Sequence, residues 1–275
     1  ELIFARHQRE AGYDPGWLSV PVVLTSHTWE NAKNEQSHQD PTLAEALMGE
    51  MSDVSRVVFP ADWNTASATL RAAYGTRGQV WAIVVPKNPV PVWFEPDEAA
   101  ALIEHGAWRL RGKGDEDVLL GAVGAYQLEQ ALLASRRLEA RGIPHSVVYI
   151  LEPGRFRTPR DSIEATHVAS PETVATLFPP KAATRLFLVH TRPEPFLGTV
   201  RPLDTGPGRT RALGYINRGG TLSIDGMLFA NRCTWAHALV AIAEGLEIAP
   251  EELLDPAELA AVRGQGDPTV LMGER

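Results

Sequence analysis

The chain has 275 residues, of which 44% are hydrophobic, and its 26 basic and 34 acidic residues give a formal net charge of −8 at pH 7. This composition is typical of a folded chain of one large or two ordinary domains, and it excludes a disordered tail, a fibre and a disulfide-stapled mini-protein. The acidic balance argues against a nucleic-acid-binding surface. Cys233 is the only cysteine, which excludes an intrachain disulfide and a Cys-rich zinc site. No stretch approaches the roughly 20 apolar residues of a membrane helix, and no signal-peptide core begins the chain, so we expect a cytoplasmic protein without membrane contact.

Short apolar runs alternate with helical patterns in the first part of the chain, which is typical of an α/β fold. The run 80–85 is apolar on both faces and predicts a central strand of a parallel sheet. Asp40 is expected to cap the first helix and Asn64 the second. Four prolines between 86 and 96 predict an extended crossover, where we place a domain boundary. The predicted strands are 22–25, 55–59 and 80–85, and the predicted helices are 41–51 and 64–75.

The second part of the chain repeats this rhythm. The clearest helix is 125–142, whose apolar positions follow one another at three- and four-residue steps up to a terminating Gly-Ile-Pro. The Gly- and Arg-rich stretch 199–220 is expected to be a loop, and a polar tail follows the last predicted helix. The sequence therefore predicts an α/β chain with domains at 1–95 and 96–275. The other elements expected are strands 118–122, 146–150 and 185–189 and helices 171–177 and 234–245.

Three motifs allow a functional and a plain structural interpretation. The glycine-bounded turn 121–124 follows a strand and opens a helix, where backbone amides hold phosphates in some proteins, but it lacks the G-x-G-x-x-G spacing, so a tight turn is favoured. Cys233 stands near a predicted helix start, and a buried structural thiol is favoured over a reactive one. An arginine run is favoured as a solvated loop over an anion clamp; its members are Arg201, Arg209, Arg211 and Arg218.

The densest polar segment is 26–41, between a predicted strand and a predicted helix. It holds His27 and His38, two of the eight histidines of the chain. Its position at the carboxyl end of a strand is where open α/β sheets bind ligands. An ordinary polar connection is the alternative interpretation.

Five segments, in order, resemble the phosphoketolases, which are thiamine diphosphate enzymes of the transketolase superfamily. The resemblance covers roughly residues 20–245 and implies two open, mostly parallel sheets flanked by helices: part of a pyrimidine-binding domain and a C-terminal domain. The matching pieces are T-S-H-T-W at 25–29, S-H-Q-D-P at 37–41, F-P-A-D-W-N at 59–64, I-V-V-P-K-N-P-V-P-V-W at 83–93, and the looser segment from L-G-Y at 213–215 to D-G-M-L at 225–228 and Asn231.

The resemblance implies a role for several matching positions. His38 is expected to transfer protons or bind the sugar, with His27 as a second catalytic candidate, and an imidazole suits such a role near neutral pH. Lys87 matches the crossover lysine that contacts the substrate phosphate in the family, and its ammonium suits that task. The substrate-binding residues that the resemblance implies are Asn34, Lys33, Gln39 and Lys87.

The sequence also departs from the family pattern. Lys33 replaces an active-site histidine, and Glu35 adds a charge beside the substrate position. The G-D-G…N magnesium motif of the diphosphate-binding domain and the glutamate that acts on the aminopyrimidine have no counterpart; Gly114-Asp115-Glu116 lies in the wrong half.

The resemblance therefore implies one part of an enzyme that cleaves or transfers a two-carbon ketol unit from a phosphorylated or sugar-like donor. A partner chain is expected to supply the diphosphate-binding half and most contacts to thiamine diphosphate and Mg²⁺, in a dimer or heterotetramer that is inactive without it. A non-catalytic binding or assembly module is one alternative. A trimmed piece of a longer polypeptide is another, because the chain begins with Glu1 rather than Met.

Overall fold

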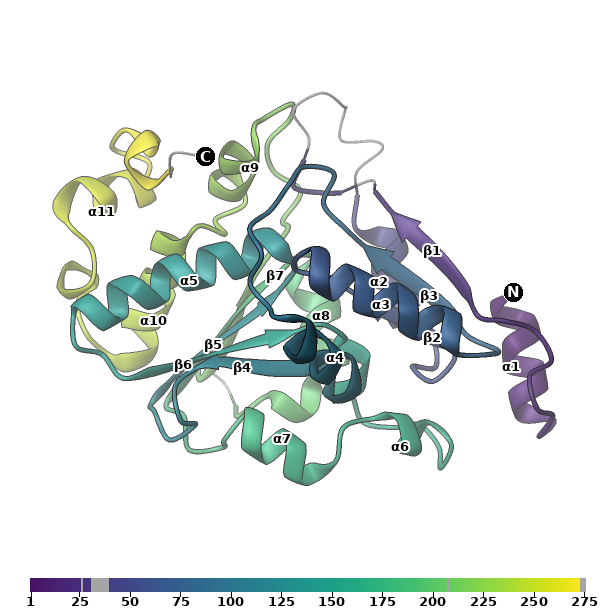
Figure 1. Ribbon diagram of the computed structural model, residues 1–275. Helices are drawn as coiled ribbons and strands as arrows, with labels where there is room; N and C mark the ends of the chain where they lie inside the picture. Colours follow the sequence, from purple (N-terminus) through teal and green to yellow (C-terminus); the bar gives the residue numbers. More distant parts are fainter. Residues whose placement is uncertain (26, 31–39, 207, 273–275) are drawn as a thin grey trace.

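The computed structural model describes residues 1–25, 27–30, 40–206 and 208–272. Two open sheets form its framework, with strand orders β1-β3-β2 and β4-β6-β5-β7-β8, and helices pack around them (Figure 1). Every strand pair is parallel except β4 with β6. The prediction of an α/β fold with two mostly parallel sheets flanked by helices is confirmed.

The smaller sheet forms from the apolar runs of the first part of the chain. Its central strand β3 (Val80–Val84) is buried at every position, as its apolar pattern predicted. Strand β2 (Ser55–Val58) is also buried throughout. Strand β1 (Val20–Leu24) lies at the other edge and is only partly covered, so that Val23 is 49% exposed. This sheet therefore has one buried edge and one open edge.

The two helices of this part begin at other residues than the sequence predicted. Helix α3 (Trp63–Gly75) starts from a capping box of Asp62 and Thr65, so the prediction of Asn64 as the cap is wrong. The carboxylate of Asp62 suits this position because it also accepts the amide of Trp93 at 2.7 Å. Helix α2 (Thr42–Met48) is shorter than 41–51 and has a proline in the N-cap position. Asp40 instead accepts the amide of Thr42 at 2.7 Å from outside the helix.

The larger sheet contains two strands that the sequence analysis missed, β4 (Ala107–Arg111) and β8 (Thr210–Leu213). Both are edge strands, and β8 lies inside the stretch 199–220 that was expected to be a loop. The three inner strands agree with the prediction to within two residues at each end. They are β5 (Val118–Val123), β6 (His145–Ile150) and β7 (Thr184–Val189).

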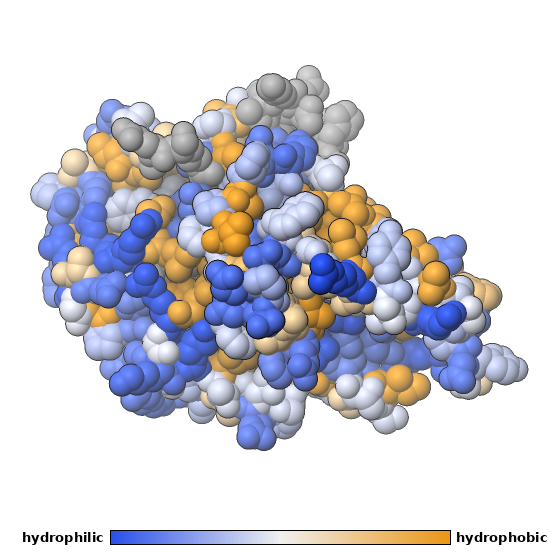
Figure 2. All heavy atoms as spheres, in the orientation of Figure 1, coloured by the Kyte–Doolittle hydropathy of each residue, from blue (hydrophilic) through white to orange (hydrophobic). Residues whose placement is uncertain are grey.

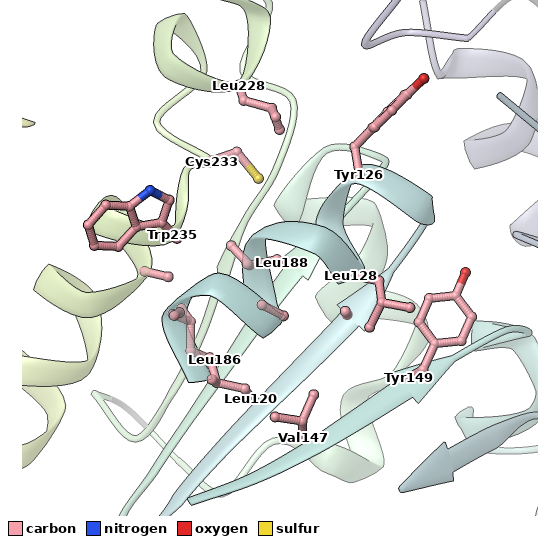
Figure 3. Close-up of a cluster of buried hydrophobic side chains, with 14 of the residues drawn as sticks. Leu120, Tyr126, Leu128, Val147, Tyr149, Leu186, Leu188, Leu228, Cys233 and Trp235 are labelled. Carbon is pink, nitrogen blue, oxygen red and sulfur yellow. The ribbon is translucent and has the colours of Figure 1, made fainter. Parts of the chain in front are cut away.

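Helix α5 (Ala125–Ala140) lies on this sheet beside α10 (Trp235–Leu246). Figure 3 shows Leu128 of α5, Leu120 of β5 and Leu186 of β7 in one apolar cluster with Cys233. This cluster continues into the smaller sheet through Ile83. Cys233 is buried, and burial raises the pKa of its thiol to about 12, which confirms the structural interpretation of this residue.

The remaining elements include helices that the sequence analysis did not predict. The crossover after β3 is extended only as far as Pro96, which begins α4 as its first residue, and the expected polar tail contains α11. Together with α7, whose bounds agree with the predicted helix 171–177, the remaining elements are α1 (Leu2–Glu10), α4 (Pro96–His105), η2 (Pro153–Phe156), α6 (Glu164–His167), α7 (Pro171–Leu177), α8 (Pro193–Thr199), η3 (Arg201–Leu203), α9 (Ile224–Ala230), η4 (Pro250–Glu252), α11 (Pro256–Val262) and η5 (Pro268–Leu271).

A buried ion pair joins the two sheets. Arg56 of β2 donates to Glu152, which follows β6, with an Nε–Oε1 distance of 2.5 Å. His167 lies 3.1 Å from the same carboxylate oxygen, and the Arg56 guanidinium lies 4.0 Å from the ring centre of Trp81. The domain boundary near residue 95 stays a prediction. The apolar cluster and the Arg56–Glu152 ion pair both connect residues before this point with residues after it.

In the part of the chain that the structure describes, no helix combines the length and the apolarity needed to cross a bilayer.

Candidate functional site

Five polar side chains gather where the strands of both sheets end. His27 and Glu30 follow β1, Lys87 follows β3, Tyr126 lies in the first turn of α5 after β5, and His190 follows β7. We call these five residues the polar junction. Because parallel strands present their carboxyl ends on the same side, residues far apart in sequence meet here.

Glu30 holds the junction together. Its carboxylate is 6% exposed and accepts the backbone amides of Lys87 at 2.9 Å and of Asn88 at 3.1 Å. The hydroxyl of Tyr126 donates to the same carboxylate. Figure 3 shows the Tyr126 ring directed away from the aliphatic cluster beneath α5. Glu30 thus fixes the crossover after β3 against the start of α5.

Two imidazoles are buried beside this carboxylate. The rings of His27 and His190 meet edge to face with centres 4.4 Å apart, and the ring of Tyr126 lies 5.2 Å from that of His27. Nδ1 of each histidine is buried and has no hydrogen-bond partner among the described residues. Buried polar atoms are normally satisfied, so two adjacent orphaned nitrogens mark a place where a polar ligand can bind.

Burial also decides the charge of both rings. It lowers the pKa of His27 to about 3, and the positive charge of Lys87 adds to the effect. Burial likewise lowers the pKa of His190 well below its usual value, with His27 as a second cause. Both imidazoles are therefore neutral at pH 7, and each offers one donor and one acceptor nitrogen.

The side chain of Lys87 is exposed at the rim of the junction, while its backbone amide is held by Glu30. An exposed ammonium on a fixed backbone is available to an anionic group that approaches the imidazoles. Its role as a phosphate contact stays a prediction.

Arg192 lies two residues after His190 and binds two carboxylates. Its guanidinium contacts Asp40 at 2.5 Å and Glu45 of α2 at 2.6 Å, and it lies 5.5 Å from the ring centre of Tyr215. Glu30 and Asp40, the described residues on either side of 31–39, are therefore both held by contacts with other parts of the chain.

The sequence analysis identified part of this arrangement. It named His27 and Lys87, which the structure brings to the same junction, although the roles of both remain predictions. It missed Glu30, Tyr126 and His190, yet His190 directly follows a predicted strand, so the strand-end rule that selected His27 also applies to it. The other candidates lie outside the described residues; they are His38, Asn34, Lys33 and Gln39.

The other motifs are accounted for by structure. Gly124 is the N-cap of α5 with φ 103°, and its amide meets the hydroxyl of Tyr149 at 3.3 Å, which confirms the tight turn. Arg209 donates to Ala182 O at 3.1 Å, whereas Arg211 donates to Ala241 O at 2.5 Å, so these arginines contact different elements. Arg201 and Arg218 are exposed.

The described residues suit a polar organic group better than a metal ion. The orphaned nitrogens of His27 and His190 match the hydrogen-bonding needs of a polar heterocycle or a sugar. No group of three or more His, Cys, Asp or Glu side chains within the described ranges could hold a metal ion.

Comparison with protein families gives a match to D-xylulose 5-phosphate/D-fructose 6-phosphate phosphoketolase over residues 1–76. The chain is 27% identical over 222 residues to a probable phosphoketolase of Bifidobacterium animalis subsp. lactis, an alignment that covers 78% of this chain and 26% of the relative. It is 30% identical over 148 residues to a probable phosphoketolase of Streptomyces avermitilis, covering 52% of this chain and 18% of the relative. The chain thus spans about a quarter or less of the length of these relatives.

Solved structures share the fold at lower sequence identity. A transketolase from Leishmania mexicana superposes with a TM-score of 0.59 at 13% identity, over 85% of this chain and 30% of that one. A split-gene transketolase, described as an inactive beta4 tetramer, superposes with a TM-score of 0.55 at 18% identity, over 90% of this chain and 74% of that one.

Proposed function

Because this chain is a member of the phosphoketolase/transketolase superfamily, we propose that it forms one part of a thiamine diphosphate enzyme. The proposed reaction is cleavage or transfer of a two-carbon ketol unit from a sugar-like donor, with phosphate or an aldehyde as the acceptor. A partner chain completes the site. The observation that carries this proposal is the pair of buried, neutral imidazoles at the carboxyl ends of β1 and β7.

The buried imidazoles fit the recognition of a sugar hydroxyl. A neutral imidazole with an unpaired nitrogen accepts a hydrogen bond from such a group, and burial, which lowers the pKa of His27 to about 3, suits His27 to this role rather than to proton uptake near neutral pH. In the proposed site His38 transfers the proton, and general acid–base catalysis of this kind contributes about 10²–10⁴-fold to a rate. His27 holds the hydroxyl, and His190 positions the His27 ring by edge-to-face contact. Thiamine diphosphate, when bound, supplies the electron sink for cleavage of the carbon–carbon bond.

Binding of the donor is assigned to the residues around the imidazoles. Lys87 contacts the substrate phosphate from the crossover that Glu30 holds. Asn34, Lys33 and Gln39 donate to or accept from the sugar hydroxyls, as the family resemblance implies. Asp40, the first described residue after them in the chain, forms an ion pair with Arg192 at 2.5 Å.

The need for a partner is supported by the open edge of the smaller sheet. Parallel sheets are normally buried on both faces, yet Val23 of β1 is 49% exposed and Trp63 of α3 is 77% exposed. A cavity of about 490 Å³ lies between them, lined chiefly by apolar groups that include Ile83 and Val90. In Figure 2, apolar residues gather along the part of the surface where Figure 1 draws β1. We assign this surface to the chain that carries the missing part of the pyrimidine-binding domain.

Co-expression tests the proposal directly. The chain would be produced together with a chain from the same source that carries the diphosphate-binding half, and the product analysed by native mass spectrometry. A heteromer that binds thiamine diphosphate and Mg²⁺ and converts D-xylulose 5-phosphate or D-fructose 6-phosphate is the expected result. If the 30.0 kDa chain remains alone or forms only a homodimer without cofactor, the enzyme assignment fails. A non-catalytic binding or assembly module is then the better interpretation.

In the assembled complex, His38→Ala should lower kcat by about two orders of magnitude, as the loss of a general acid–base group typically does. His105→Ala is the matched control, because His105 is exposed at the end of α4. Equal turnover in the two variants would remove His38 from the proposed site.

A further inference from the structure

A second cavity lies at the far end of β7 from the polar junction. It has a volume of about 950 Å³ and is lined by Arg185, the second residue of β7, and by segments around α6 and α7. His190 follows the last residue of the same strand, so strand geometry places the two sites roughly 17 Å apart. Figure 1 draws α6 and α7 along the lower edge of the molecule. This cavity is therefore separate from the proposed active site.

Part of its lining is apolar and rigid. The rings of Phe156 and Phe178 pack edge to face with centres 5.2 Å apart, and both side chains are buried. Val168 of the segment after α6 and Val174 of α7 also line the cavity. Such a surface can bind the flat or apolar body of a small molecule, and the volume is typical of ligand pockets.

The charged lining is unusual for a protein with an overall charge of −8. Three arginines face a single carboxylate; they are Arg155, Arg157 and Arg185, with Asp204. The cavity thus concentrates positive charge in an acidic chain, which favours anionic ligands.

Among the three arginines, Arg185 gives the strongest indication of an anion-binding site. It is 2% exposed and donates only to backbone carbonyls, to Leu203 O at 2.5 Å and to Phe178 O at 2.8 Å among others. Among the described residues its hydrogen-bond partners are three backbone carbonyls and no carboxylate, and its Nε has no hydrogen-bond partner. Burial lowers its pKa to about 10, and Asp204 only partly opposes this. A buried charge that makes no direct ion pair is costly, so an anion bound nearby would stabilise it.

The two neighbouring arginines are incompletely paired as well. Arg155 donates to Glu104 O at 2.6 Å, and burial lowers the pKa of its guanidinium. Arg157 donates from Nη1 to Glu50 O at 2.8 Å and to Met48 O at 3.2 Å, and its Nε lies 3.5 Å from a carboxylate oxygen of Glu164. The Nε of Arg155 is buried without a hydrogen-bond partner in the described ranges. Their side chains are less deeply buried than that of Arg185, so they can approach an anion that enters the cavity.

We propose that this cavity binds a small organic anion, with its apolar body against Phe156 and Phe178 and its carboxylate or phosphate among the three arginines. The proposal does not depend on the catalytic assignment, because it concerns the opposite end of β7 and needs neither cofactor nor partner. It predicts a ligand that combines a flat or apolar part with a negative charge.

Isothermal titration of the full chain with phenyl phosphate, benzoate, benzyl alcohol and inorganic phosphate tests this. We expect saturable 1:1 binding of phenyl phosphate or benzoate, and the tighter of the two identifies the anionic group. We also expect at least tenfold weaker binding of the neutral alcohol and of inorganic phosphate. Absence of binding of both organic anions at millimolar concentrations overturns the proposal, and so does equal affinity for benzyl alcohol.

Variants locate the binding. Arg155→Gln should weaken the binding of the favoured probe at least tenfold, and Ala169→Phe should block the cavity from another wall. Arg136→Gln, an exposed arginine of α5 outside the cavity, should leave the affinity unchanged. Arg185→Gln adds a third test where the variant folds. Unchanged affinity in both Arg155→Gln and Ala169→Phe would place the binding elsewhere and refute the assignment.

Discussion

The buried imidazoles of the polar junction should make the protein sensitive to mild acid. The pKa of His27 is about 3 in the folded chain, against about 6.5 for an unperturbed histidine. Between these values the unfolded chain binds more protons than the folded chain, so the free energy of unfolding falls as the pH falls. Each such group lowers it by about 1.4 kcal/mol per pH unit below pH 6.5, or by about 2 kcal/mol at pH 5.

Urea denaturation at several pH values between 7.5 and 5 measures this dependence. His27→Gln should remove the contribution of one group, so its free energy of unfolding should fall between pH 7.5 and 5 by about 2 kcal/mol less than that of the unsubstituted chain. A part of the slope should remain, because burial also lowers the pKa of His190 and brings that of His237 to about 4.

His105→Gln is the control for this comparison, because His105 is exposed and should keep the full slope. The comparison uses slopes, so any general destabilisation by the substitution cancels. If His27→Gln shows the same pH dependence as the unsubstituted chain, His27 is not buried neutral in solution, and the argument for the orphaned nitrogens fails with it.

Three further substitutions test other parts of the structure. Arg56→Met should lower the free energy of unfolding by about 3–5 kcal/mol, because it leaves Glu152 charged and buried, and urea denaturation should show much of this loss restored by adding Glu152→Leu. Lys87→Ala in the assembled enzyme should raise KM for a phosphorylated donor by roughly tenfold with a smaller effect on kcat, whereas steady-state kinetics of the Lys113→Ala control should be unchanged. Gly124→Ala should cost about 1–3 kcal/mol in thermal unfolding, because φ is 103° and the new Cβ would lie 3.2 Å from that of His190; a cost below 0.5 kcal/mol would contradict this.

The strands that the sequence marks most clearly are β3 and β5, which are buried at every position and contain only apolar residues and one glycine. β4 and β8 were missed because edge strands tolerate charged residues, such as Arg109 and Arg211, on their open side. α4 was missed because Pro96 was taken as part of the extended crossover, although proline is well suited to the first position of a helix.

The candidate site was predictable only where a strand end could be recognised. His27 and Lys87 follow apolar runs, and the resemblance to phosphoketolases added expectations for residues between them. The partners of Glu30 could not be read from the sequence, because Lys87 and Tyr126 are 57 and 96 residues away along the chain. Only the packing of the two sheets brings them together, and local pattern contains no information on that distance.

The single buried thiol of this chain gives its unfolding a built-in chemical reporter. Cys233 is 0% exposed, and its Sγ lies 3.6 Å from Leu213 O, between β8 and α10. A thiol reagent reaches it only when this part of the core opens. Labelling rates measured without denaturant therefore report the rate of opening when the reagent is concentrated enough to outpace reclosing, and the open fraction when it is not, with no introduced probe.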